Sequence, residues 1–226
     1  MKKTGMIVAV EIEAVLEKYG EAEKQETIGN MQFMHYQMPS YELVMVHCGV
    51  GEIAAAAACQ LLISLYGCEI IVNSGVVGGL PKEMTLSKTC IVEKVVHYDF
   101  DCSGIDKVRP GQYSGLPDEY IPTDKELLQK ALEFMPGLKP VICASADKFV
   151  SGEKNKAYLH ETYNADICEM DAAGIALVCL RNRVPCLMIK CVSDAITGGG
   201  EEFYREVLNS SAVCLEVTDK ILRSLA

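Results

Sequence analysis

Short apolar segments alternate with patterns typical of amphipathic helices along the whole chain. Apolar runs of strand length occupy residues 4–10, 69–74, 141–145 and 184–193, and helical patterns lie between them. This alternation predicts an α/β fold. The sequence shows no linker and no internal repeat, and α/β proteins of 226 residues commonly form one domain. We therefore expect a single domain over residues 1–226.

Acidic residues directly follow several of the predicted strands. Glu11 and Glu13 come after the first strand, Glu169 and Asp171 after a short apolar run in the middle of the chain, and Asp194 after a late strand. Ligands of open α/β sheets bind at the carboxyl ends of strands, so these carboxylates are expected along one rim. A simpler alternative is that Asp171 only caps the following helix, with Glu169 solvated beside it. We expect Glu11 to lie on the surface.

A cluster of carboxylates at one rim suits reactions that pass through a cationic centre. Carboxylates stabilise an oxocarbenium ion, protonate a leaving group or activate water, so cleavage of a glycosidic bond fits this inventory. The glycine-rich residues 75–79 do not match a dinucleotide-binding motif, and Pro81 follows them directly. These glycines either allow a ligand to approach the backbone closely or form a tight turn.

Composition excludes several other classes of function. A net charge of −10 with no basic run argues against binding to nucleic acid, and no apolar run is long enough to span a bilayer. The eleven cysteines include no C-x-x-C pair, and the four histidines show no metal-ligand spacing. We expect a cytoplasmic protein with buried thiols, no metal and no organic cofactor.

Six stretches resemble, in order and spacing, the nucleoside phosphorylase/nucleosidase superfamily, and most closely its 5′-methylthioadenosine/S-adenosylhomocysteine nucleosidases. The resemblance covers nearly the whole chain. It implies a three-layer α/β/α sandwich with a mixed, partly closed central sheet. The matching stretches are Val8–Glu13, Cys48–Gly51, Asn73–Leu80, Ser145–Gly152, Glu169–Asp171 and Val192–Asp194.

The resemblance also implies catalytic roles. Glu13 matches the glutamate that acts as the general base on the attacking water. Asp194 matches the aspartate that protonates purine N7, and Ser193 beside it helps to orient that carboxyl group. The implied reaction is hydrolysis of the N-glycosidic bond of 5′-substituted adenosines such as methylthioadenosine or S-adenosylhomocysteine, with release of adenine.

The matched positions further imply a substrate-binding set. Phe149 would stack on the adenine ring, and the backbone of Val150 would bind its Watson–Crick edge. Met170 would pack under the ribose, and Asp171 would hold its hydroxyl groups. The other residues expected at the substrate site are Val50, Gly78 and Glu169.

Two alternatives stay open beside the nucleosidase hypothesis. Phosphorylases of this superfamily bind phosphate through a Gly-Asp-Pro-type turn and an arginine near the N-terminus. Residues 8–14 here contain two glutamates and no arginine, which favours hydrolysis over a purine or uridine phosphorylase. The second alternative is a nucleoside-binding protein with weak activity. It would follow from Asp171, Lys190 and Val76, which stand where the nucleosidases usually have glutamate, arginine and serine.

Family resemblance also suggests a homodimer in which Cys102 and Ile105 of a neighbouring chain close the pocket for the 5′ group. The natural 5′ substituent is left open by the sequence. Glycines 198–200 fall where an aromatic residue often lines that pocket.

Overall fold

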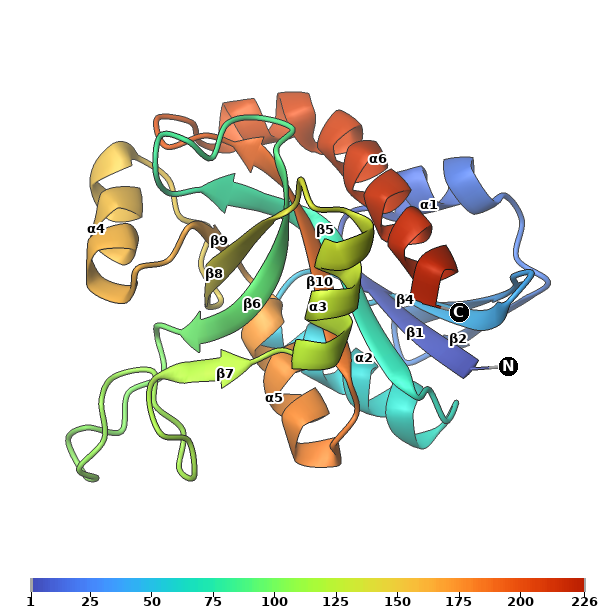
Figure 1. Ribbon diagram of the computed structural model, residues 1–226, viewed down its shortest axis with the longest axis horizontal. Coiled ribbons are helices and arrows are strands. Elements are labelled where there is room, and N and C mark those ends of the chain that lie inside the picture. Colours follow the sequence, from blue (N-terminus) through green and yellow to red (C-terminus); the bar gives the residue numbers. More distant parts are fainter. Residues whose placement is uncertain (1, 226) are drawn as a thin grey trace.

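The computed structural model describes residues 2–225, which form ten strands and six helices (Figure 1). The strands are β1 (Lys2–Val8), β2 (Lys24–Ile28), β3 (Met31–Gln37), β4 (Tyr41–His47), β5 (Ile70–Gly79), β6 (Thr89–His97), β7 (Tyr120–Pro122), β8 (Lys139–Ser145), β9 (Ile167–Glu169) and β10 (Cys186–Asp194). The helices are α1 (Ile12–Tyr19), α2 (Glu52–Ser64), α3 (Lys125–Phe134), α4 (Glu153–Tyr163), α5 (Ala172–Asn182) and α6 (Gly200–Leu225).

All ten strands belong to one mixed sheet, part of which closes on itself. β5 pairs with β10 and with β9, β10 pairs with β6, β6 with β8, and β8 with β9, so these five strands form a ring. From β5 the sheet continues outward through β1, β4, β3 and β2. The expected mixed and partly closed sheet is therefore confirmed.

Helices cover both faces of this sheet, and the alternation of side chains along each strand supplies both cores. In β1, Ile7 packs into the cluster beneath α2 and α5, whereas the next residue, Val8, packs into the cluster beneath α1, α3 and α6. In β5, Ile71 and Val72 divide in the same way. Figure 1 shows α1 and α6 together on one side and α2 and α5 on the other. The sheet is thus buried on both faces, which explains its uninterrupted apolar runs.

The parallel strands β1, β5 and β10 place their carboxyl ends at one edge. β5 is longer than its apolar run, because it continues through the glycine-rich segment to Gly79. The segment is therefore strand and not a turn. None of the helices in residues 2–225 combines the length and the apolar composition needed to cross a membrane.

Candidate active site

A cavity of about 290 Å³ opens where the carboxyl ends of β1, β5 and β10 meet. Most of its wall comes from five segments that are distant in sequence, and Val50, Phe203 and Tyr204 complete it. The five segments are residues 9–11 after β1, 76–78 at the end of β5, 148–150 after β8, 168–171 around the end of β9, and 193–194 at the end of β10. The structure thus brings acids from separate strands to one rim, as the sequence pattern indicates.

Glu11 lies in this cavity and is only 6% exposed. Its Oε2 accepts hydrogen bonds from the backbone N–H groups of Ala9 and Val10, both at 2.9 Å, and its Oε1 accepts one from Val76 N at 3.0 Å. Three charge-assisted bonds fix the orientation of this carboxylate. The expectation that Glu11 lies on the surface is therefore wrong.

Glu13 stands outside the cavity, contrary to the role the sequence suggested for it. Helix α1 begins at Ile12, so Glu13 lies in its first turn, where the side chain is exposed. Glu11 is the residue before the helix, whereas the buried residues of α1 are Ala14 and Val15, so Glu13 lies on the outer face of α1. The position of Glu13 does not suit a base for a bound substrate, whereas that of Glu11 does.

Asp194 ends β10 inside the cavity and is 2% exposed. Ser193 Oγ donates a hydrogen bond of 3.1 Å to Asp194 Oδ1. On the other carboxylate oxygen, Oδ2, the Lys156 ammonium of α4 donates a hydrogen bond of 2.5 Å. Lys156 is completely buried, and we did not predict it as a site residue from the sequence.

Two glycines of β5 make room for these acids. A Cβ on Gly75 would lie 2.9 Å from Glu11 Oε1, and a Cβ on Gly78 would lie 3.0 Å from Asp194 Oδ2. The glycines thus allow other groups to approach the backbone of β5 closely. The sequence analysis offered a ligand as the approaching group, whereas the structure shows the protein's own carboxylates there. The two positions are three residues apart, or roughly 10 Å along the strand.

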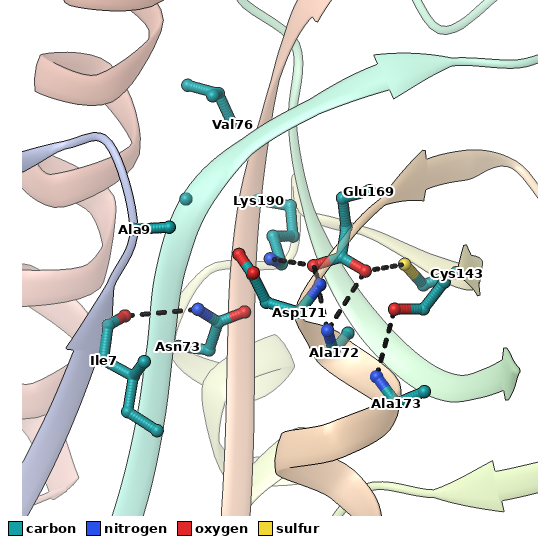
Figure 2. A network of polar contacts seen from close by, with 12 residues as sticks. Ile7, Ala9, Asn73, Val76, Cys143, Glu169, Asp171, Ala172, Ala173 and Lys190 are labelled. Carbon is teal, nitrogen blue, oxygen red and sulfur yellow. Dashed lines mark hydrogen bonds and ion pairs between the residues drawn. The ribbon is translucent and has the colours of Figure 1, made fainter. Parts of the chain in front are cut away.

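A buried charge network lies behind the cavity (Figure 2). Glu169 Oε2 accepts hydrogen bonds from the Lys190 ammonium at 3.1 Å and from the N–H groups of Asp171 and Ala172 at 3.0 Å. Glu169 therefore caps α5, and the alternative in which it is solvated is wrong. Burial would raise the pKa of Glu169, but the neighbouring Lys190 charge lowers it below its usual range. Burial would lower the pKa of Lys190, but Glu169 raises it above its usual value.

Asp171 borders the cavity, where its Oδ1 accepts a hydrogen bond of 2.8 Å from Gly51 N. It occupies the N-cap position of α5 but makes no capping bond there, so it is not simply a helix cap. Burial and the charge of Glu169 raise the pKa of Asp171 to about 7.

Glu52, at the start of α2, is a further buried carboxylate that the sequence pattern did not reveal. It accepts hydrogen bonds from the Ser145 hydroxyl group and from Gly174 N, and so ties α2 to β8 and α5. Burial raises the pKa of Glu52 to about 8, and the negative charge of Glu169 makes the next largest contribution. Its role in the fold is to hold the segment that carries Asp171.

Aromatic and apolar groups form the outer part of the cavity. Phe149 is 45% exposed and meets Phe203 edge-on, with the ring centroids 5.6 Å apart. Phe203 and Tyr204, at the start of α6, supply the aromatic wall that glycines 198–200 cannot supply. The predicted site residues Val50, Gly78, Val150 and Met170 also line the cavity.

Within residues 2–225, no group of three or more His, Cys, Asp or Glu side chains is arranged to hold a metal ion. All eleven cysteines are unpaired, and all except Cys102 are buried.

Comparison with known proteins defines the class of this fold and site. The family model of the Phosphorylase superfamily matches residues 4–226, and the chain belongs to this family. Its relatives include an aminodeoxyfutalosine nucleosidase of Campylobacter jejuni, 28% identical over 220 residues, which are 95% of each chain. A 5′-methylthioadenosine/S-adenosylhomocysteine nucleosidase of Shewanella halifaxensis is 30% identical over 198 residues, which are 85% of this chain and 86% of the relative.

Solved structures agree with this assignment. The crystal structure of Campylobacter jejuni 5′-methylthioadenosine/S-adenosylhomocysteine nucleosidase superposes with a TM-score of 0.88 at 27% identity and covers 98% of both chains. The native structure of futalosine hydrolase of Helicobacter pylori reaches a TM-score of 0.91 at 23% identity, covering 98% of this chain and 97% of the other, which shows the shared fold. These relatives are nucleosidases, so the protein is an enzyme of the N-glycosidic hydrolase class.

Proposed function

We propose that this protein hydrolyses the N-glycosidic bond of 5′-substituted adenosines, with Glu11 as the base that activates water and Asp194 as the acid that protonates the purine. The observation that carries the proposal is the placement of two buried carboxylates against one strand of one cavity, at Gly75 and at Gly78. Both carboxylates line the same cavity of about 290 Å³, in which we place a nucleoside and a water molecule between them.

The reaction needs a proton at one end of the bond and an attacking oxygen at the other. Asp194 donates a proton to N7, and the electrons of the C1′–N9 bond pass to the purine, which leaves as neutral adenine. Glu11 takes a proton from water as the water oxygen bonds to C1′. The negative charge of Glu11 also favours the oxocarbenium character of the sugar in the transition state.

The remaining cavity residues orient the substrate. Phe149 stacks on the adenine, and the Val150 backbone pairs with its Watson–Crick edge. Asp171 Oδ1 accepts a hydrogen bond from Gly51 N, and Oδ2 accepts one from a ribose hydroxyl group of the substrate. Met170 packs under the sugar, and Val50 and Phe203 border the 5′ group.

Glu11 also distinguishes hydrolysis from phosphorolysis. A carboxylate held by three N–H groups at the position of the nucleophile would repel phosphate and attract a neutral water. Among the described residues that line the cavity, Lys148 alone carries a positive charge. A phosphorylase is therefore the weaker of the two enzyme hypotheses.

For the substrate, we propose methylthioadenosine and S-adenosylhomocysteine first, and aminodeoxyfutalosine as the second candidate. The second candidate is supported by the Campylobacter jejuni relative and by the outer wall of the cavity, where Tyr204 is 80% exposed and borders solvent. The three substrates share the adenine and the ribose and differ at the 5′ position.

The test is release of adenine from each of these three nucleosides in phosphate-free buffer and with phosphate added. Release without phosphate is the expected result, and the ratios of kcat/KM would rank the substrates. Release only with phosphate would establish a phosphorylase instead. Tight binding of adenosine analogues without any adenine release would support a binding protein that has lost its chemistry.

We also propose that the protein forms a homodimer in the cytoplasm. Val50, Ile53 and Ile105 are 51%, 81% and 86% exposed, and apolar side chains of this size favour burial against a second copy. The unpaired cysteines are typical of a reducing compartment. Light scattering would measure the mass in solution, and a monomer that retains full activity would contradict the dimeric 5′ pocket. Cell fractionation would test the location.

A further inference from the structure

A buried lysine contacts the proposed acid directly, although it lies outside the motifs that define the site. Lys156 Nζ is 2.5 Å from Asp194 Oδ2, 2.6 Å from the Ala195 carbonyl oxygen and 3.3 Å from the Asp194 carbonyl oxygen. The side chains of Lys156 and Asp194 are 0% and 2% exposed. All three acceptors of this ammonium therefore belong to the end of β10 and the residue after it.

The cost of burying such a lysine points to a use beyond stability. An ammonium group that loses its water must regain its interactions within the protein, and replacing a buried ion pair by apolar groups is often neutral or stabilising. Helix α4 carries Lys156 on its inner face, in register with Leu159 and Tyr163. An apolar residue would fit that pattern better, so the lysine is explained by what it contacts.

The chemistry of Asp194 indicates what this contact does. When Asp194 passes its proton to N7, a neutral carboxyl group becomes a carboxylate at a buried position. A positive charge 2.5 Å from Oδ2 stabilises that carboxylate and makes the proton transfer more favourable. Asp194 regains a proton from solvent after adenine leaves, and the proton that Glu11 took from water is released, so the cycle balances.

We propose that Lys156 is the positioning residue of the acid: it aims Asp194 Oδ2 and stabilises the carboxylate that forms when the purine is protonated. This inference rests on the proposed function, because it assigns Asp194 to N7. Ser193 holds the other oxygen, Oδ1, so both oxygens of the carboxylate have a fixed partner.

Two adenosine analogues separate this role from a structural one. 9-Deazaadenosine carries a permanent hydrogen on N7 and presents to Asp194 the state reached after proton transfer. 7-Deazaadenosine has a C–H group at that position and can neither accept nor donate a proton there. We expect the wild type to bind 9-deazaadenosine more tightly, by roughly tenfold or more, because a hydrogen bond to a charged group is worth that much.

Lys156→Met should remove most of this preference while the affinity for 7-deazaadenosine stays within about threefold. Lys156→Gln keeps a donor but lacks the charge and should behave in the same way, whereas Lys156→Arg should retain the preference. Lys154→Met, an exposed substitution on the same helix, is the matched control and should leave both affinities unchanged. Isothermal titration measures the affinities, and thermal unfolding identifies any variant that has lost its fold.

The outcomes distinguish the two hypotheses. If the wild type binds both analogues equally, Asp194 does not meet N7 and the proposed function itself is wrong. If the wild type shows the preference and folded Lys156→Met or Lys156→Gln keeps it, the role of Lys156 is refuted. An equal loss of affinity for both analogues would also overturn it, since that pattern belongs to a lysine that only supports the shape of the cavity.

Discussion

Substitution of Glu11 by glutamine, with Glu13→Gln as its matched control, tests the central assignment. Both changes remove one carboxylate and keep the size of the side chain, and the two residues are only two positions apart. Glu11 lies in the cavity with three backbone donors, whereas Glu13 points into solvent from the first turn of α1. Any difference between the variants therefore reports the position of the carboxylate.

The expected magnitude follows from the lost proton transfer. A positioned general base contributes about 10²–10⁴ to the rate, which is about 3–5 kcal/mol of transition-state stabilisation. Glu11→Gln should lower kcat by that factor. Its amide NH₂ must also face one of the three N–H donors of Ala9, Val10 and Val76, so the variant should lose roughly 1–3 kcal/mol of stability. Glu13→Gln should keep kcat within about twofold and stability within about 0.5 kcal/mol.

The assay is adenine release from methylthioadenosine at saturating substrate, with urea unfolding of each variant in parallel. Folded Glu11→Gln with more than about one tenth of the wild-type kcat would refute the assignment of the base. A hundredfold loss in Glu13→Gln would instead restore the role that the sequence resemblance implied, and would require α1 to unwind when substrate binds.

Three further predictions follow from the same geometry. Burial and a nearby carboxylate raise the pKa of Glu52 to about 8 from an ordinary value of 4.5, so between these values it is protonated in the folded chain and ionised in the unfolded one. The contribution of Glu52 to wild-type stability therefore falls as pH rises through that window. Glutamine does not titrate, so the melting temperature of Glu52→Gln minus that of the wild type should be higher at pH 9 than at pH 6. The same difference at both pH values would contradict this prediction. Gly78→Ala places a Cβ 3.0 Å from Asp194 Oδ2 and should lower kcat about tenfold to a hundredfold, whereas Gly137→Ala, with no atom within 4 Å, should leave it unchanged in the same assay. Phe149→Ala removes the stacking partner of the base and should raise KM about tenfold with less effect on kcat, and an unchanged KM would place the adenine elsewhere.

The architecture could be read from the sequence because burial on both faces leaves a strong apolar signal in each strand. The apolar runs at residues 4–10 and 184–193 correspond to β1 and β10, each within a few residues at its ends. The extension of β5 to Gly79 could not be read in this way. Glycine has no side chain, so a glycine-rich segment lacks the alternating pattern that identifies a strand. Glycines stand at positions 75 and 78 because Glu11 and Asp194 approach the backbone there.

Glu11 and Lys156 were not predicted as site residues, because the direction in which a side chain points from a helix or its first residue is hard to read from a sequence. The sequence motif identified the segment after β1 that borders the cavity. Which of Glu11 and Glu13 faces inward depends on the residue at which α1 begins, and sequence patterns place helix ends only within a few residues. Lys156 did carry a signal. It occupies the inner face of α4 with Leu159 and Tyr163, at spacings of three and seven residues, and a lysine at an apolar position of a helix indicates a buried charge with a partner.

The balance of charge among the buried acids and lysines of this site could not be read from the sequence. Lys156 pairs with Asp194 and Lys190 pairs with Glu169, so each buried lysine accounts for one carboxylate. Glu52 and Asp171 are buried beside them and form no ion pair, and burial together with the charge of Glu169 raises the pKa of Glu52 to about 8 and that of Asp171 to about 7. Near neutral pH, Glu52 is therefore mostly protonated and Asp171 is about half protonated. The raised pKa values of Glu52 and Asp171 therefore limit the negative charge that gathers at the starts of α2 and α5.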